Sequence, residues 1–284
     1  MPAAANILLA MNDATLKEPM TAYLAFKVAL KQEDTDSALR CLNQISDGLA
    51  SDPKYIYACC LEAQQAMDRI TTIKALQHIV LKHQFHSSDL IHIPALLRVL
   101  IRLEVSVLDD EKETSIDREG IVKDICNLFK TAVDEILKER RDNKSDKLFT
   151  IEELDWFCKN AYNLGLGNAM AWEARHVITI LECCLSIISA YPADVPAQMV
   201  ADISLRGMFC NFMAATVLLA LARSEDNNEL RLQDYLNMRH HIQHFHETLE
   251  SRVDALDETS REDLQFKLST LLVFEFEGAT CLKS

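Results

Sequence analysis

The sequence predicts an all-α protein, an α-solenoid of about 10–12 helices arranged as antiparallel hairpins. Three observations support this prediction. Glycine and proline occur only six times each in 284 residues, and aromatic residues make up 7% of the chain, which favours leucine- and alanine-rich helices over sheets. Apolar residues recur at helical spacing, and no long segment alternates with the period of a strand. The N-terminal part of the chain also repeats itself.

The repeat emerges when the sequence is shifted by the tetratricopeptide (TPR) period, which is about 34 residues. The shift places Pro19 on Pro53, Tyr23 on Tyr57, Asp34 on Asp68, Leu39 on Ile73, Arg40 on Lys74, Leu42 on Leu76 and Ile45 on Ile79. Small residues recur at Ala38 and Cys41 and again at Thr72 and Ala75, where paired helices must approach closely. The full TPR signature is missing, so we expect degenerate TPR-like repeats.

Residues that typically begin or end helices predict where each helix lies along the chain. We expect residues 1–18 to be a frayed segment or the remnant of a preceding repeat, and residues 19–284 to be one TPR-like helical repeat domain. A charged linker is expected at 139–148. Helices are expected from Pro19 to about Lys31, after Asp34, from Pro53, from Pro94, over 121–136, within a hairpin at 149–192, and over 194–222, 229–254 and 260–281.

Charge and composition exclude several classes of protein. The net charge of −14 opposes the phosphate attraction on which most nucleic-acid binding depends, so we expect no direct nucleic-acid contact. The longest apolar span, 212–222, is shorter than a membrane crossing, and the first residues lack a basic signal-peptide region. The nine cysteines include no C-x-x-C pair and lie in apolar surroundings, which indicates free thiols in a reducing compartment. We therefore expect a soluble intracellular protein without membrane contact.

Two groups of residues could in principle bind a metal. Glu173 and His176 form the E-x-x-H half of a di-metal carboxylate site, but no second copy occurs. The densest histidine group has no accompanying H-E-x-x-H motif or cysteine pair; it comprises His240, His241, His244 and His246. The chain also lacks a glycine-rich phosphate loop and a G-x-S-x-G motif. We therefore expect no cofactor, no metal and no enzyme activity.

The stretch 149–192 carries both tryptophans and the candidate interaction site. Thr150 and Glu153 predict a capped helix start. The face predicted to point inward comprises Leu154, Phe157, Cys158, Ala161 and Leu164. Trp156, Asn160 and Asn163 fall together on the opposite side. These three residues either pack against a neighbouring repeat or face a groove in which the asparagines hold a peptide main chain.

The run 154–166, Leu-Asp-Trp-Phe-Cys-Lys-Asn-Ala-Tyr-Asn-Leu-Gly-Leu, is followed by Trp-Glu-Ala-Arg-His at 172–176 and Tyr-Pro at 191–192. This pattern resembles the Spo/Zip-type meiosis and sporulation family of TPR proteins, especially its fungal members. Supporting segments lie in the same order at 55–65, 92–98, 220–226 and 235–239, so the resemblance covers most of residues 19–245.

The resemblance implies a non-enzymatic scaffold in the nucleus. Such a scaffold would gather recombination and synaptonemal-complex proteins on meiotic chromosomes and so promote crossing over. Family members are longer, so the chain is expected to be a fragment or a shortened paralogue. The motif positions that could bind a partner are Trp156, Asn160, Tyr162 and Asn163. Two other interpretations stay open: a peptide-binding TPR adaptor of the co-chaperone type, which needs a basic carboxylate clamp, and a metal-dependent helical enzyme.

Overall fold

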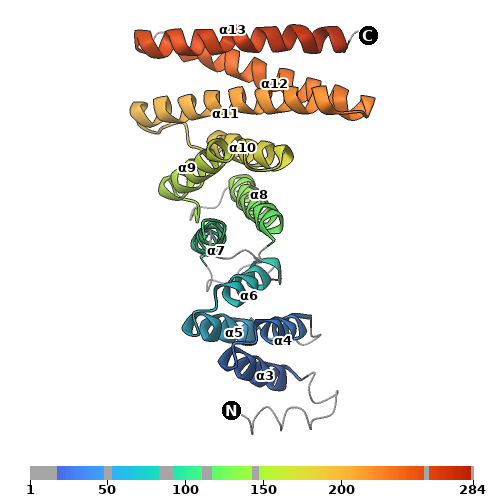
Figure 1. Ribbon diagram of the computed structural model, residues 1–284. Helices are drawn as coiled ribbons and strands as arrows, with labels where there is room; N and C mark the ends of the chain where they lie inside the picture. Colours follow the sequence, from blue (N-terminus) through green and yellow to red (C-terminus); the bar gives the residue numbers. More distant parts are fainter. Residues whose placement is uncertain are drawn as a thin grey trace. The chain divides into compact units, whose positions relative to one another are not determined.

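The protein is described here from a computed structural model covering residues 18–47, 53–82, 92–110, 117–142, 147–252 and 256–282. Within these residues every regular element is a helix, and eleven helices, α3 to α13, follow one another along the chain (Figure 1). The predicted all-α class is confirmed. The helices form two compact units, residues 1–115 and 116–284, which are described separately below. The expected N-terminal segment lies outside the described residues, except for Glu18.

The first unit contains two hairpins and a further helix. These are α3 (Pro19–Lys31), α4 (Thr35–Asp47), α5 (Pro53–Gln65), α6 (Arg69–Lys82) and α7 (Ile93–Leu108). Helix α3 packs on α4 and α5 packs on α6. Between the hairpins, corresponding helices contact each other: α3 packs against α5, and α4 packs against α6. Helix α7 packs on α6. Corresponding helices of the two hairpins begin one TPR period apart, as the shift in sequence predicts.

The turns inside these hairpins repeat as closely as the helices do. Glu33 and Met67 both adopt left-handed backbone conformations, with φ values of 57° and 59°. Next to them, the N–H of Asp34 donates to the Ala29 carbonyl and the N–H of Asp68 donates to the Ala63 carbonyl, at 3.0 and 3.1 Å. These bonds close the C-terminus of the first helix of each hairpin in a Schellman motif.

The same two aspartates cap the helix that follows. Asp34 Oδ1 accepts from the backbone N–H of Ser37, and Asp68 Oδ1 accepts from that of Thr71, both at 3.0 Å. Each aspartate also accepts from the hydroxyl of that same residue, so the side chain satisfies donors at the exposed helix start. The Asp34–Asp68 match in the sequence therefore reflects a complete repeated turn.

Polar contacts between the hairpins supplement the apolar packing. Lys27 Nζ lies 2.6 Å from Glu62 Oε1, and the hydroxyl of Tyr23 donates to the same oxygen at 3.1 Å. On the other side of the unit, the Ser46 hydroxyl lies 2.7 Å from His78 Nδ1. The first contact joins α3 to α5 and the second joins α4 to α6, so both layers of the unit are linked.

Substitution of the two capping aspartates should have unequal effects. Asp34→Ala is expected to lower the free energy of unfolding modestly, because a single N-cap is lost. Asp68 also accepts from the Thr35 hydroxyl of the neighbouring hairpin, at 3.2 Å, so Asp68→Ala is expected to cost roughly 1 kcal/mol more. Urea denaturation of both variants measures the difference. Equal costs would show that the contact with Thr35 adds no stability.

The second unit consists of six helices. These are α8 (Arg118–Asp142), α9 (Ile151–Gly167), α10 (Ala174–Ser189), α11 (Ala197–Ser224), α12 (Asn228–Arg252) and α13 (Glu258–Cys281). Helix α10 contacts α8, α9 and α11, while α12 lies between α11 and α13 (Figure 1). The last three helices agree with the predicted ranges to within three residues at each end.

The expected linker at 139–148 is partly helical, because α8 continues to Asp142. Residues 143–146 lie outside the described part of the chain. Glu139, on the last turns of α8, accepts from the backbone N–H groups of Leu148 and Phe149. This carboxylate ties the residues before α9 back to α8.

The core of the second unit contains a long apolar helix, α11. Within the described residues, only α11 is long and apolar enough to cross a membrane, judged by length and composition. Half of its most apolar 18-residue window is buried inside the structure, which is also typical of a core helix. Its buried side chains, among them Met208, Leu218 and Leu219, pack with Tyr235, Phe245 and others in one apolar cluster.

Candidate protein-interaction site

The candidate site is built on α9, whose start agrees with the sequence. Thr150 is the N-cap, and its hydroxyl accepts from the Glu153 N–H at 3.4 Å. Four residues of the predicted inward face are at most 4% exposed: Leu154, Phe157, Cys158 and Ala161. Leu164, the fifth, is only half-buried. The inward face instead continues through Gly165, where an added Cβ would lie 2.7 Å from Leu181 Cδ2 of α10.

An aromatic cluster fixes the middle of α9. Phe157 is fully buried and meets the edge of Phe129 on α8 at a centroid distance of 6.3 Å. Phe149 lies 5.8 Å away on the other side. The ring of Trp156 stands at 86° to that of Phe157, 4.9 Å between centroids. Such tilted pairs add stability beyond area burial, so Trp156 is held in place by a core residue.

The structure places three of the four candidate residues on one face of α9. Trp156, Asn160 and Asn163 follow at intervals of four and three residues, and they lie one above another on a helix. Trp156 and Asn160 are half-buried, and Asn163 is exposed. The amide Nδ2 of Asn160 donates to the Trp156 carbonyl of the same helix at 2.7 Å. This bond leaves the Oδ1 of Asn160 as the group that can accept from a partner.

Tyr162 does not belong to this face. Its side chain is half-buried. Burial raises the pKa of its phenol. Cys184 of α10 and Arg206 and Cys210 of α11 contribute electrostatically to that pKa. Tyr162 therefore helps to join α9 to α10 and α11, and the partner-facing set on α9 reduces to Trp156, Asn160 and Asn163.

A buried group of thiols lies beside Tyr162. Cys158 Sγ and Cys184 Sγ are 3.8 Å apart, and Arg206 Nη1 lies 3.7 Å from Cys158 Sγ and 3.3 Å from Asp155 Oδ1. The contact with Cys184 and then burial raise the pKa of Cys158. All nine cysteines are free, as the sequence predicts, and burial makes these thiols poor nucleophiles. The group is an apolar packing element.

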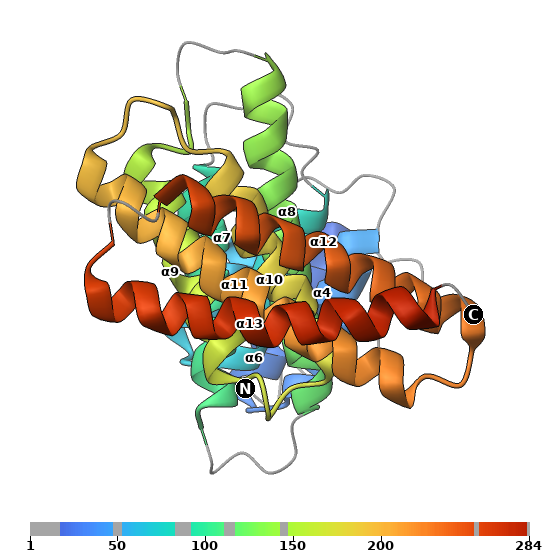
Figure 2. The ribbon, with the colours of Figure 1, turned by 90° about the horizontal axis from the view of Figure 1, so that it is seen from above.

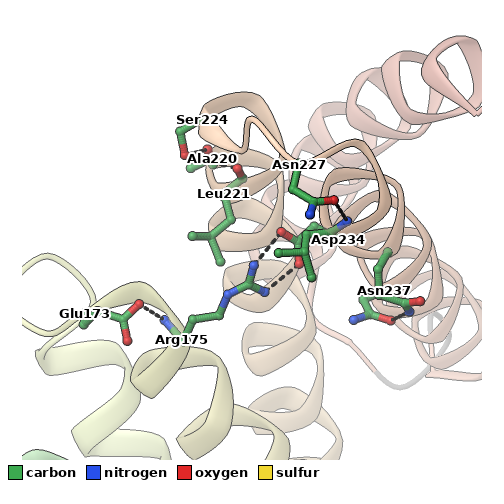
Figure 3. Close-up of polar contacts among 10 residues, drawn as sticks. Glu173, Arg175, Ala220, Leu221, Ser224, Asn227, Asp234 and Asn237 are labelled. Carbon is green, nitrogen blue, oxygen red and sulfur yellow. Dashed lines mark hydrogen bonds and ion pairs between the residues drawn. The ribbon is translucent and has the colours of Figure 1, made fainter.

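An ion pair that sequence reasoning missed joins α10 to α12. Arg175 Nη1 and Nη2 lie 2.6 and 2.8 Å from Asp234 Oδ1 and Oδ2, and the Asp234 side chain is only 2% exposed (Figure 3). Glu173 Oε1 accepts from the backbone N–H of Arg175 at 3.1 Å, which caps α10. The hydrogen bonds to Asp234 raise the pKa of Arg175. Arg175 lies within the family-like Trp-Glu-Ala-Arg-His run, but its partner is distant in the sequence.

The metal candidates meet only in pairs among the described residues. Glu173 is occupied as the N-cap of α10, although its Oε2 lies 3.5 Å from His176 Nδ1. In the histidine group, the rings of His240 and His244 meet edge to face, with centroids 4.3 Å apart. Among the described residues, no three histidine, cysteine, aspartate or glutamate side chains are grouped so that they could hold a metal ion.

His241 differs from its neighbours because it is buried. Its Nδ1 lies 2.8 Å from Asn211 Oδ1, while Asn211 Nδ2 donates to the Gly207 carbonyl. With the amide oriented in this way, the imidazole must carry its proton on Nδ1 and donate it. Burial, with smaller contributions from His240 and His244, lowers the pKa of His241 to about 4.

Acid should therefore weaken the second unit through His241. The unfolded imidazole binds a proton below its ordinary pKa of about 6.5, whereas the folded one does so only below about 4. The contribution to stability is complete above pH 6.5 and is lost as the pH falls toward 4, by up to about 3 kcal/mol. His241→Gln should flatten this part of the profile in urea titrations between pH 7 and 4.5, and His244→Gln should not. Parallel profiles for wild type and His241→Gln would contradict the assignment.

Comparison with known proteins identifies no relative: no protein-family model, no curated protein and no solved structure matches the chain. The resemblance to the meiosis and sporulation family therefore stays a prediction, carried by the residues quoted for it. The site geometry and the repeated hairpins provide the basis for a functional proposal.

Proposed function

We propose that the chain is a non-enzymatic protein-interaction scaffold, an α-solenoid of TPR-like hairpins. The observation that supports this most strongly is the repeated hairpin of the first unit. Helix starts, left-handed turn residues and aspartate caps recur together at the TPR period. Repeats that pack mainly on their neighbours leave long continuous surfaces, which suit partner binding.

The α9 face is the proposed binding surface of the second unit. A half-buried tryptophan held by Phe157 offers a rigid aromatic anchor, and tryptophan is enriched among residues that dominate binding energy. The exposed Asn163 amide supplies both a donor and an acceptor for a peptide main chain. An anchor flanked by amides fits a protein partner that presents a segment of backbone.

The proposed biological role is the promotion of meiotic crossing over. It rests on the resemblance of residues 154–166 and 172–176 to the meiosis and sporulation family. The partners would be recombination and synaptonemal-complex proteins, and the chain would act in the nucleus without contacting nucleic acid itself. The net charge of −14 is consistent with recruitment through proteins.

Affinity purification followed by mass spectrometry tests this role. The tagged full chain is purified from meiotic and from vegetative cells, together with Asn163→Ala and an exposed control away from this face, Gln233→Ala on α12. Recombination proteins should be recovered from meiotic cells with the wild type and the control and be depleted with Asn163→Ala. Normal crossover numbers in a deletion strain would refute the meiotic role.

Calorimetry separates the proposal from a co-chaperone adaptor. Acidic peptides with a free C-terminal carboxylate are titrated into the full chain, with amidated peptides as the control. The scaffold proposal predicts no difference between the two forms. Tight binding that disappears on amidation would favour the adaptor.

A further inference from the structure

Helix α13 carries two apolar stripes on opposite faces. The inward stripe has a spacing of seven residues through Leu264, Leu271 and Gly278, which pack on α12 and α11. At Gly278 the approach is close, because an added Cβ would lie 2.9 Å from Met238 Cε of α12. Packing against the unit therefore accounts for one face only.

The outward stripe is unusually exposed for its composition. Phe266 and Phe276 are each 73% exposed, Val273 is 65% exposed and Leu272 is 47% exposed. Between Asp263 and Thr280 the most exposed residues carry no charge; they are Gln265, Phe266, Ser269, Leu272, Val273 and Phe276. Glu275, whose side chain is 37% exposed, is paired with Arg239 of α12 at 3.6 Å. In both views α13 is the outermost described helix of its unit (Figures 1 and 2). No described helix of the unit covers this stripe.

We infer that this face pairs α13 with α13 of a second copy of the chain in antiparallel orientation. The positions 266, 269, 273 and 276 alternate in steps of three and four residues, the pattern of a two-helix seam. A two-fold axis at the level of Leu271 sets Phe266 opposite Phe276 of the second copy. It also sets Ser269 opposite Val273 of the second copy. The stripe is therefore self-complementary, as an isologous interface requires. Each phenylalanine ring would pack against a phenylalanine ring of the second copy, and each Ser269 against a Val273.

The exposed apolar area reaches what a specific dimer needs. A phenylalanine side chain offers roughly 200 Å², so the four exposed apolar side chains present roughly 500 Å² per copy. Burial in both copies would remove about 1,000 Å² from water, the lower limit for a specific interface. The stripe also needs a partner surface that carries no charge, and the same stripe of a second copy is such a surface. A second copy satisfies both conditions, and the two helix dipoles would oppose each other favourably.

Sedimentation equilibrium on the full chain tests the pairing. The wild type should be a concentration-dependent dimer. Phe266→Glu and Phe276→Glu should each raise the dimer dissociation constant at least about a hundredfold, because a carboxylate would be buried against a ring. Leu61→Glu, at an exposed leucine of α5 that is 59% exposed, should leave the dimer unchanged. Because all these side chains are exposed, circular dichroism should show folded variants.

A double variant tests the antiparallel register. In Phe266→Lys/Phe276→Glu each lysine would face a glutamate of the second copy, so the dimer should recover relative to either single substitution. A parallel arrangement would instead set like charges together. The proposal is overturned by a monomeric wild type, by a dimer that survives both single substitutions, or by a double variant that stays monomeric.

Discussion

Arg175→Met is expected to lower the free energy of unfolding by about 2–3 kcal/mol, because it leaves the carboxylate of Asp234 buried without its partner, whereas the arginine side chain itself is 44% exposed. The Asp234 side chain is 2% exposed, and both its oxygens accept from the guanidinium. Methionine preserves most of the apolar contact of the arginine stem, so the effect reports the lost charge. Urea denaturation followed by circular dichroism measures it.

The chain provides a matched control in the second unit. Arg223 also contacts both oxygens of a carboxylate, that of Glu277, but this carboxylate side chain is 29% exposed, against 2% for Asp234. Arg223→Met should cost less than about 1 kcal/mol, as exposed ion pairs usually do. In addition, Arg175→Met combined with Asp234→Leu should recover most of the lost stability, because no charge is then buried. Equal costs for the two arginine substitutions would contradict the importance of burial.

Phe157→Ala is expected to cost about 3–5 kcal/mol, since it empties a fully buried site between α8 and α9. Trp156→Ala should cost distinctly less, because the indole is half-buried and packs edge-on to the phenylalanine ring. Thermal and urea unfolding of both variants, with Leu154→Ala as the second core reference, measures the order.

The same pair distinguishes packing from partner binding. Trp156→Ala should abolish recovery of partners at a temperature at which the variant remains folded. If Trp156→Ala unfolds the chain as severely as Leu154→Ala does, the tryptophan is a core residue and the α9 face loses its anchor. Asn163→Ala, at an exposed position, would then be the only remaining test of that face.

Local sequence signals predicted the helices because the residues that end and begin them act over a few positions. Pro19 and Pro53 open helices and Thr150 caps α9, as the sequence predicts, and a helix follows Asp34 as expected. The capping by Asp34 and Asp68 emerges only from the structure. Helical periodicity likewise placed most of the buried face of α9. These effects depend on neighbours within one turn, which a single sequence displays directly.

Contacts between distant residues could not be predicted in this way. Arg175 and Asp234 are each ordinary surface-type residues in the sequence, and only the packing of α10 near α12 brings them together. Tyr162 directly precedes Asn163 in the sequence, yet the rotation of about 100° per residue places it off the candidate face. Nothing in the sequence around Gly165 indicates that Leu181 of α10 packs closely against it. The contacts of Arg175 and Gly165 depend on the distance between helices, which periodicity does not encode.

The aspartate that ends one helix and begins the next has a consequence for how the hairpins open. Asp34 donates its backbone N–H to the carbonyl of Ala29 in α3 and offers its carboxylate to Ser37 in α4. Fraying of either helix end removes a bond made by the same residue, so the two ends should not open independently. Amide hydrogen exchange at these helix ends should therefore proceed as a single event, and Asp34→Ala should separate it into two.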